Sequence, residues 1–319
     1  MKKVIAIVLA VMMLCAVTAC GGGESADDTY TVGICQLVQH PALDAATQGF
    51  KNALTEALGD KVKFEEGNAS NDSVNCATIV NGFVSGGVDL ILANATPALQ
   101  AAASATDSIP VLGTAVTEYG VALSIDNFNG TVGNNISGTS DLAPLDQQAD
   151  MITELFPDAK NVGILYCSGE PNSVYQAKVV KDCLEKKNIK VDVYTFADSN
   201  DVSTVTSSAC ANSDVIYIPT DNTAASCTEA ISAVALPAGV PIVAGEEGIC
   251  KGCGVATLSI DYYELGRTTG QMAVKILKGE ANVSEMPIEY YPNPVKKYNA
   301  DIASKLNVTI PEGYTAISD

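Results

Sequence analysis

Polar and acidic side chains recur where the apolar runs of this sequence end. Thr96, Asn172 and Thr223 each stand near the start of an expected helix, where capping of that helix would by itself explain them. Their shared position matters more, because open α/β sheets bind ligands at the carboxyl ends of their strands. We therefore expect one ligand site built from these turns. Its candidate residues are His40, Asn94, Thr96, Pro97, Ser140, Asp141, Glu170, Asn172, Ser173, Asp221, Asn222, Thr223 and Glu246.

The same residue types argue against catalysis. The sequence has one histidine, no GxSxG nucleophile turn and no GxxxxGK[ST] phosphate-binding loop. The one local cysteine pair, Cys250 with Cys253, has no second cluster of metal ligands to complete a zinc site. The pattern favours a binding protein, with no cofactor and no metal, over an enzyme.

The element that positions His40 can be predicted in detail. Residues 30–38 form an apolar run with β-branched side chains, and the run breaks at Gln39-His40-Pro41. Apolar residues then recur at steps of three and four, as they do on one buried face of a helix. Proline is favoured at the first position of a helix, and Gly59 marks its end. We expect a strand, a tight turn at His40 and a helix. The apolar face consists of Leu43, Ala46, Phe50, Leu54 and Ala57.

Strand-like and helix-like segments alternate along the rest of the chain. This alternation predicts parallel sheets covered by helices on both faces, so the fold class is α/β. Further strands are expected at 61–66, 88–93, 109–113, 121–124, 162–166, 191–194, 215–218, 242–244, 255–260 and about 288. Helices are expected at 73–86, 97–103, 145–156, 172–187, 202–211, 223–235, 263–278 and 294–306.

About 290 residues exceed the usual size of one hydrophobic core, so we expect two doubly wound lobes. The segment 127–138 is rich in Asn and Gly and has no periodicity, which indicates a first crossing between lobes near 138. Further crossings are expected near 261 and 291. The N-terminal lobe then comprises 30–138 with 262–290, and the C-terminal lobe comprises 139–261 with 291–319. Three crossings form a hinge, and hinged lobes close on a ligand between them.

The amino-terminal segment indicates export. Lys2 and Lys3 precede an almost wholly apolar stretch, which is too short to be a membrane span. The run Val17-Thr-Ala-Cys20 resembles a bacterial lipoprotein cleavage box. By that resemblance residues 1–19 are a signal peptide, Cys20 becomes lipidated, and 20–29 tether the protein to the outer face of the cell membrane.

The chain is strongly acidic. Removal of residues 1–19 takes away Lys2 and Lys3 and no acid, so the net charge of -19 becomes -21. Such a charge repels nucleic acid and anionic lipid, and its simplest meaning is solubility.

Eight cysteines remain after Cys15 and Cys20 are set aside, and their pairing cannot be deduced from sequence. Buried free thiols are expected at Cys35, Cys167, Cys183, Cys210 and Cys227. The Cys250–Cys253 segment reads as a Gly-rich turn between two strands. Either a structural pair or free thiols would fit there.

Several motifs, in order along the chain, resemble one branch of the solute-binding lipoproteins of ABC importers. The branch is the tryptophan- and aromatic-amino-acid-binding type. The motifs are Gln39-His-Pro-Ala-Leu-Asp44, Asn94-Ala-Thr-Pro97, Gly138-Thr-Ser-Asp141, Glu170-Pro-Asn-Ser173, Pro219-Thr-Asp-Asn-Thr223, Glu246-Glu-Gly248, Asp261-Tyr-Tyr-Glu-Leu-Gly266 and Leu306-Asn-Val-Thr-Ile-Pro311.

This resemblance implies a type I periplasmic-binding-protein fold, in which two lobes close on a solute like a Venus flytrap. It implies a monomer that delivers its solute, best guessed as an aromatic amino acid, to a permease and its ATPase. The alternative is a lipoprotein that presents its solute to a separate signalling partner.

The resemblance also implies roles for site residues. An amino acid's ammonium needs a carboxylate, for which Asp221 is the first choice and Asp141 or Glu246 the alternatives. Its carboxylate suits a helix start, at Thr96-Pro97 or at Asn172-Ser173. His40 either contacts the ligand or caps its helix.

Overall fold

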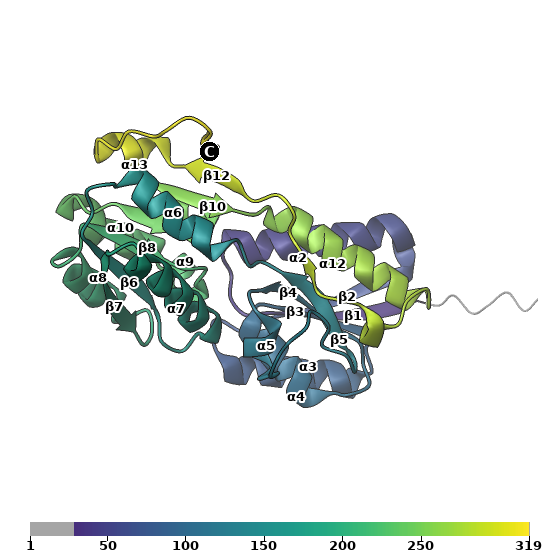
Figure 1. The fold of residues 1–319 in the computed structure, drawn as a ribbon. Coiled ribbons are helices and arrows are strands. Elements are labelled where there is room, and N and C mark those ends of the chain that lie inside the picture. Colours follow the sequence, from purple (N-terminus) through teal and green to yellow (C-terminus); the bar gives the residue numbers. More distant parts are fainter. Residues whose placement is uncertain (1–28, 319) are drawn as a thin grey trace, which may run out of the picture.

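A computed structural model of the chain describes residues 29–318 (Figure 1). The signal peptide and Cys20 that the sequence predicts lie outside these residues. None of the helices within them is both long and apolar enough to cross a membrane.

Within the described residues, one sheet has six strands in the order β11-β5-β4-β3-β1-β2, and every neighbouring pair is parallel. We call this sheet and its helices the N-terminal lobe. Its strands are β1 (Tyr30–Gln36), β2 (Val62–Asn68), β3 (Leu90–Asn94), β4 (Val111–Val116), β5 (Ile136–Ser140) and β11 (Glu289–Tyr290).

Helices cover both faces of this sheet (Figure 1). On one face lie α2 (Pro41–Leu58) and α12 (Tyr262–Leu277). On the other lie α3 (Ser73–Gly86), α4 (Thr96–Ala105) and α5 (Tyr119–Ala122). Two single-turn 3-10 helices, η1 (Gly59–Lys61) and η2 (Val283–Glu285), complete this lobe.

The second sheet of the described residues has seven strands in the order β13-β12-β10-β9-β8-β6-β7 and belongs to the C-terminal lobe. Only the β10–β12 pair is antiparallel. Its strands are β6 (Asn161–Cys167), β7 (Lys190–Phe196), β8 (Val215–Ile218), β9 (Ile242–Ala244), β10 (Ala256–Ser259), β12 (Val295–Tyr298) and β13 (Thr315–Ala316).

The helices of the C-terminal lobe also form two layers, each with its own apolar core. The first layer contains α6 (Leu145–Leu155), α7 (Pro171–Lys186) and α13 (Ala300–Lys305). The second contains α8 (Val202–Cys210), α9 (Asn222–Ser226), α10 (Thr228–Ala238) and α11 (Glu247–Cys253).

The chain passes between the two lobes three times, between β5 and α6, between β10 and α12, and between β11 and β12. Two α/β lobes with parallel sheets and a three-crossing hinge are what the sequence predicts, so this fold class is confirmed.

Close contact between α2 and α12 fixes the position of α2 on the sheet, and with it that of His40, which precedes the helix. A Cβ atom on Gly49 would lie 2.0 Å from the carbonyl oxygen of Tyr263, and one on Gly266 would lie 2.0 Å from that of Ala46. Only glycine lets the two backbones approach this far. Asn94 adds a second anchor, since its amide donates to the carbonyl of Leu43 at 2.9 Å.

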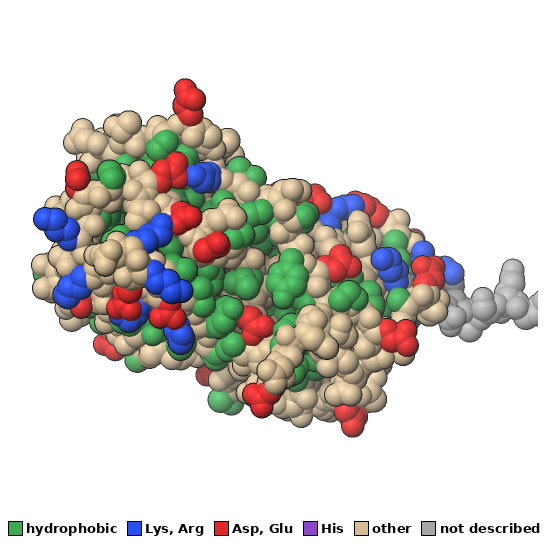
Figure 2. All heavy atoms as spheres, in the orientation of Figure 1, with side chains coloured by type: hydrophobic (Ala, Val, Ile, Leu, Met, Phe, Trp, Pro, Cys, Tyr) green, Lys and Arg blue, Asp and Glu red, His purple; other side chains and the backbone are tan. Residues whose placement is uncertain are grey.

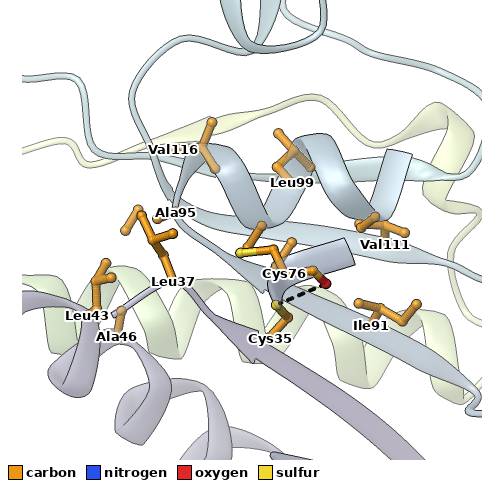
Figure 3. Close-up of a cluster of buried hydrophobic side chains, with 14 of the residues drawn as sticks. Cys35, Leu37, Leu43, Ala46, Cys76, Ile91, Ala95, Leu99, Val111 and Val116 are labelled. Atoms are coloured by element: carbon orange, nitrogen blue, oxygen red, sulfur yellow. Dashed lines mark hydrogen bonds between the residues drawn. The ribbon is translucent and has the colours of Figure 1, made fainter. Parts of the chain in front are cut away.

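In the N-terminal lobe, the core near the carboxyl ends of the strands consists largely of small and aliphatic side chains (Figure 3). Cys35 and Cys76 meet in it, and the Cys35 thiol donates to the Cys76 carbonyl oxygen across 4.0 Å. Each of the eight cysteines in the described residues is a free thiol, as the sequence allowed, but Cys183, Cys210 and Cys227 are only partly buried and not fully buried as expected.

The structure corrects four expectations about elements. Residues 121–124 are not a strand, because the Glu118 carboxylate caps the Val121 N–H at 2.5 Å and starts α5. The segment expected to be only a crossing contains most of β5.

The other two corrections lie in the C-terminal lobe. Cys250 and Cys253 lie on α11, not in a turn, because Glu246 accepts hydrogen bonds from the N–H groups of Gly248 and Ile249. The expected final helix is a strand, β12, paired with β10, followed by the short α13.

Candidate functional site

The carboxyl ends of both sheets face each other, and nearly all the predicted site residues lie between them. Twelve of the thirteen are buried although all twelve are polar or charged: His40, Asn94, Thr96, Ser140, Asp141, Glu170, Asn172, Ser173, Asp221, Asn222, Thr223 and Glu246. Pro97 is only half-buried and lines a surface hollow between α3 and α4 instead.

The hinge side of the cleft holds Asp141, which follows β5 at the first crossing. Its Oδ2 accepts a hydrogen bond at 3.0 Å from the hydroxyl of Tyr262, which starts α12 at the second crossing. Its Oδ1 is buried and has no hydrogen-bond partner in the protein. Burial raises the pKa of Asp141 to about 6, because the loss of water disfavours its charged form, and the hydrogen bond from Tyr262 opposes this only in part. Asp141 is therefore a buried carboxylate with an unused acceptor atom.

Asp221 is used differently, within the C-terminal lobe. One carboxylate oxygen accepts from the Ala224 N–H at 2.7 Å and caps α9. The other accepts from the Cys167 N–H at 2.8 Å and the Ser173 hydroxyl at 2.7 Å. Burial, aided by the charge of Glu170, raises the pKa of Asp221 to about 8. Both oxygens already have partners, so Asp221 supports the turn.

Glu246 has the same capping role at α11, and burial raises its pKa to about 7. Asn172 donates to Glu170 and to the Thr220 carbonyl oxygen, while its own Oδ1 has no partner in the protein. Asn172 thus offers an acceptor, whereas Glu246 offers little to a ligand.

Three helices begin at the cleft without a side-chain cap: α2 after His40, α4 after Ala95 and α7 after Glu170. Each has proline in its first turn. The first N–H groups of a helix have no partner inside the helix. Uncapped starts therefore present backbone donors, and the partial positive charge of the helix end favours an anion there.

Two side chains of the N-terminal lobe reach across to α9. His40 Nε2 lies 3.3 Å from Asn222 Oδ1, and the Asn71 amide donates to the Thr223 hydroxyl at 3.0 Å. Burial lowers the pKa of His40, so its ring is neutral near pH 7. Its Nδ1 has no partner in the protein, and it makes no side-chain cap.

Sequence reasoning missed Asn71 and Tyr262 as site residues. Asn71 lies outside the helix expected at 73–86, in the turn between β2 and α3, and its left-handed conformation, with φ of 63°, directs its side chain toward α9. Tyr262 follows the crossing that the sequence predicts near 261. Its position next to Asp261, the cap of α12, was the available signal, since a helix start at a crossing must lie beside the cleft.

Every buried carboxylate of the described residues belongs to this site, namely Asp141, Glu170, Asp221 and Glu246, and no Lys or Arg there is buried. On the face shown in Figure 2, basic side chains lie over the outer parts of the two lobes. Many form surface ion pairs, such as Lys178 with Asp182. The cleft is therefore an acidic environment suited to a cationic group.

Other surface features do not compete with this site. A hollow of about 750 Å³ lies where β6 and β7 begin, at the opposite edge of the sheet from the ligand-binding edge of α/β folds. The described residues contain no cluster of His, Cys, Asp and Glu able to hold a metal ion.

Comparison with known proteins identifies the family. The model of the family of ABC transporter substrate binding proteins matches residues 31–318. The chain belongs to this family. Members of it are solute-binding proteins of ABC transporters that act outside the cytoplasm, so this chain is an extracytoplasmic solute-binding protein with a role in transport.

Named relatives come from several bacteria. A tyrosine-binding protein of Clostridioides difficile (strain R20291) is 36% identical over 305 residues, which cover 90% of this chain and 87% of the relative. An ABC domain from Streptococcus pneumoniae, solved in complex with L-Trp, is 32% identical with a TM-score of 0.86, covering 91% of this chain and 100% of that one.

A ligand-free, open structure of a substrate-binding protein with adhesive properties from Clostridium difficile is 37% identical, covering 91% of this chain and 99% of that one. Its TM-score is only 0.69, although its sequence identity exceeds that of the L-Trp complex. Rotation of one lobe against the other lowers the similarity of whole chains while leaving each lobe unchanged. Together with the direct contacts from His40 and Asn71 to α9, this indicates a closed arrangement of the lobes.

Proposed function

We propose that this solute-binding protein captures an aromatic α-amino acid, tyrosine or tryptophan, and presents it unchanged to an ABC permease and its ATPase. The proposal is supported by the relatives named for tyrosine and solved with L-Trp. The observation that carries it is the set of four buried carboxylates in a cleft without a buried Lys or Arg among the described residues. Such a cleft disfavours an anion and favours a ligand that brings an ammonium group.

The ammonium group would bind Asp141 in place of the sequence-based first choice, Asp221. Asp141 Oδ1 is free to accept, while its other oxygen is held in place by Tyr262. Both oxygens of Asp221 are occupied by partners in its own lobe. A charge-assisted hydrogen bond from an ammonium group to a buried carboxylate is among the stronger polar contacts in proteins.

The ligand carboxylate would bind at the start of α4, where Thr96 is buried and no side chain caps the helix. Thr96 follows β3 and Asp141 follows β5, with β4 between them. Adjacent strands lie about 4.8 Å apart, so the two backbones are separated by roughly 10 Å. An aspartate side chain, two hydrogen bonds and the head group of an α-amino acid together span that distance.

His40 Nδ1 and Asn172 Oδ1 are further candidate contacts, because both atoms are buried without a protein partner. Tyr119 does not supply the apolar wall of the site, because it is a core residue whose hydroxyl donates to the Thr139 carbonyl oxygen. The side chain of the ligand would therefore lie elsewhere, against partly buried residues such as Tyr166.

We further propose that the mature protein is a monomer anchored to the outer face of the cell membrane through lipidated Cys20. The support is the resemblance of Val17-Thr-Ala-Cys20 to a lipoprotein cleavage box. We also propose that the lobes are divided near residues 138, 261 and 290. Because β5 ends at Ser140, the first boundary lies at that residue.

Titration of purified protein lacking residues 1–20 with L-Trp tests the function directly. The protein contains no tryptophan, so the indole emission reports the ligand alone. Saturable binding of L-Trp, or of L-Tyr in competition, is expected, with no binding of acidic amino acids. A thermal-shift screen in which no amino acid raises the melting temperature would refute the assignment of the ligand while leaving the family intact.

A further inference from the structure

Two hydrogen bonds between the lobes are organised by one carboxylate. On the N-terminal lobe, His40 and Asn71 are the donors, and on the C-terminal lobe Asn222 and Thr223 are the acceptors. The two acceptors are consecutive residues at the start of α9. Both also bond to Glu170, which lies just before α7 and is 4% exposed.

Glu170 accepts from both acceptor residues through both of its oxygens. Its Oε2 accepts from the Asn222 backbone N–H at 3.0 Å and from the Asn222 amide at 2.7 Å. Its Oε1 accepts from the Thr223 N–H and the Thr223 hydroxyl, each at 2.8 Å. The Asn172 amide also donates to Oε2, at 3.1 Å. One side chain thus receives five hydrogen bonds, four of them from these two residues.

These bonds determine which atoms face the other lobe. Because the Asn222 amide group donates to Glu170, its carbonyl oxygen is turned toward His40, whose Nε2–H donates to it. Because the Thr223 hydroxyl gives its proton to Glu170, only its lone pairs remain, and they accept from Asn71. Without the carboxylate, neither side chain would be fixed as an acceptor.

We propose that Glu170 is the positioning residue for lobe closure. It holds Asn222 and Thr223 as two preset acceptors that engage His40 and Asn71 only when the lobes meet, and so it sets how long a solute stays bound. The inference rests on the proposed function, because a solute must be captured by closure. It assigns Glu170 a role in the closed state and not in direct ligand contact.

Asn71→Gly tests the contact from the N-terminal side. Glycine retains the left-handed backbone of Asn71, with φ of 63°, and removes only the donor. One hydrogen bond contributes about 1 kcal/mol, so the dissociation rate of L-Trp should rise about fivefold with an unchanged association rate. Asn188→Gly is the matched control, because Asn188 is exposed and has φ of 62°. Its dissociation rate should stay at the wild-type value.

Glu170→Leu tests the positioning role. Leucine has a similar size but no acceptor oxygen, so neither Asn222 nor Thr223 is held as an acceptor, and both hydrogen bonds across the cleft should be lost. The dissociation rate should rise roughly 25-fold, and Asn71→Gly should then add less than twofold. If Glu170 only supports its own lobe, Asn71→Gly keeps its full fivefold effect in the Glu170→Leu protein, and the inference is overturned.

A second variant and a second measurement keep the test decisive. Should Glu170→Leu fail to fold, Thr223→Val removes the acceptor hydroxyl at nearly equal volume, and it should abolish the effect of Asn71→Gly. If neither L-Trp nor L-Tyr binds, the proposed function fails. X-ray scattering of the ligand-free proteins then tests the two hydrogen bonds between the lobes independently of the ligand. The wild-type protein should then be more compact than Thr223→Val, and identical scattering curves would overturn the inference.

Discussion

Asp141→Asn should weaken amino-acid binding more than any other single isosteric change at the cleft. Asparagine retains the size of the side chain and an acceptor for Tyr262, but it removes the charge that would face the ligand ammonium. A hydrogen bond to a charged group contributes about 1.5–3 kcal/mol, so Kd should rise about 10- to 150-fold above pH 7.

The pH dependence of binding provides the sharper signature. The pKa of Asp141 is about 6, and the proton must leave before the ammonium group can bind. The protonation of Asp141 should therefore make the affinity about tenfold weaker at about pH 5 than at pH 7. Binding should release a proton below pH 6, and the Asp141→Asn protein should lose this dependence.

L-Trp fluorescence titrations across pH measure both effects, since the protein contains no tryptophan of its own. Asp261→Asn is the control, because Asp261 is an exposed helix cap at the neighbouring crossing and asparagine caps equally well. A Kd within threefold of wild type for Asp141→Asn, or an unchanged pH profile, would refute the assignment of the ammonium site.

Three further outcomes are expected. Asp221→Ala should lower the free energy of unfolding by about 2 kcal/mol, or the melting temperature by roughly 4–8 °C, because it removes the α9 cap and leaves the buried Cys167 N–H unpaired. Its affinity for L-Trp should change less than that of Asp141→Asn. The reverse ranking of the two affinities would restore Asp221 as the ligand partner. Gly49→Ala should prevent stable folding, because its Cβ would lie 2.0 Å from the Tyr263 carbonyl oxygen. Gly82→Ala is the control: its Cβ would have no neighbouring atom within 4 Å, so the protein should melt at or above the wild-type temperature. The free energy of unfolding should fall as pH rises from about 5 to about 8. Folding raises the pKa of Asp141, Glu246 and Asp221, so the folded state binds protons more tightly than the unfolded chain. Urea midpoints that rise over this pH range would contradict this expectation.

Local patterns sufficed to predict α2 and most of the strands. The apolar spacing from Leu43 onward, Pro41 at the start and Gly59 at the end are all properties of neighbouring residues. The strand β5 could not be found in this way, because its Ser137 and Thr139 are polar. They are buried because the Ser137 hydroxyl donates to the Met286 carbonyl oxygen and the Thr139 hydroxyl bonds to that of Thr269, more than a hundred residues away.

The candidate site shows the same division. The turns at the strand ends were identifiable because residue type and position both pointed to them. The roles within the turns were not, because they depend on distant partners. Asp221 and Asp141 are both acidic residues in turns, and only the contacts of Asp221 with Cys167 and Ser173 distinguish the helix cap from the free acceptor.

The measurement that tests the central claim most directly is a crystal structure of the protein with L-Tyr or L-Trp bound. The ligand ammonium nitrogen should lie about 2.8 Å from Asp141 Oδ1, with the ligand carboxylate at the first N–H groups of α4 near Thr96. An ammonium group bound to Asp221 or Glu246, or a ligand outside the space between the two lobes, would contradict the account.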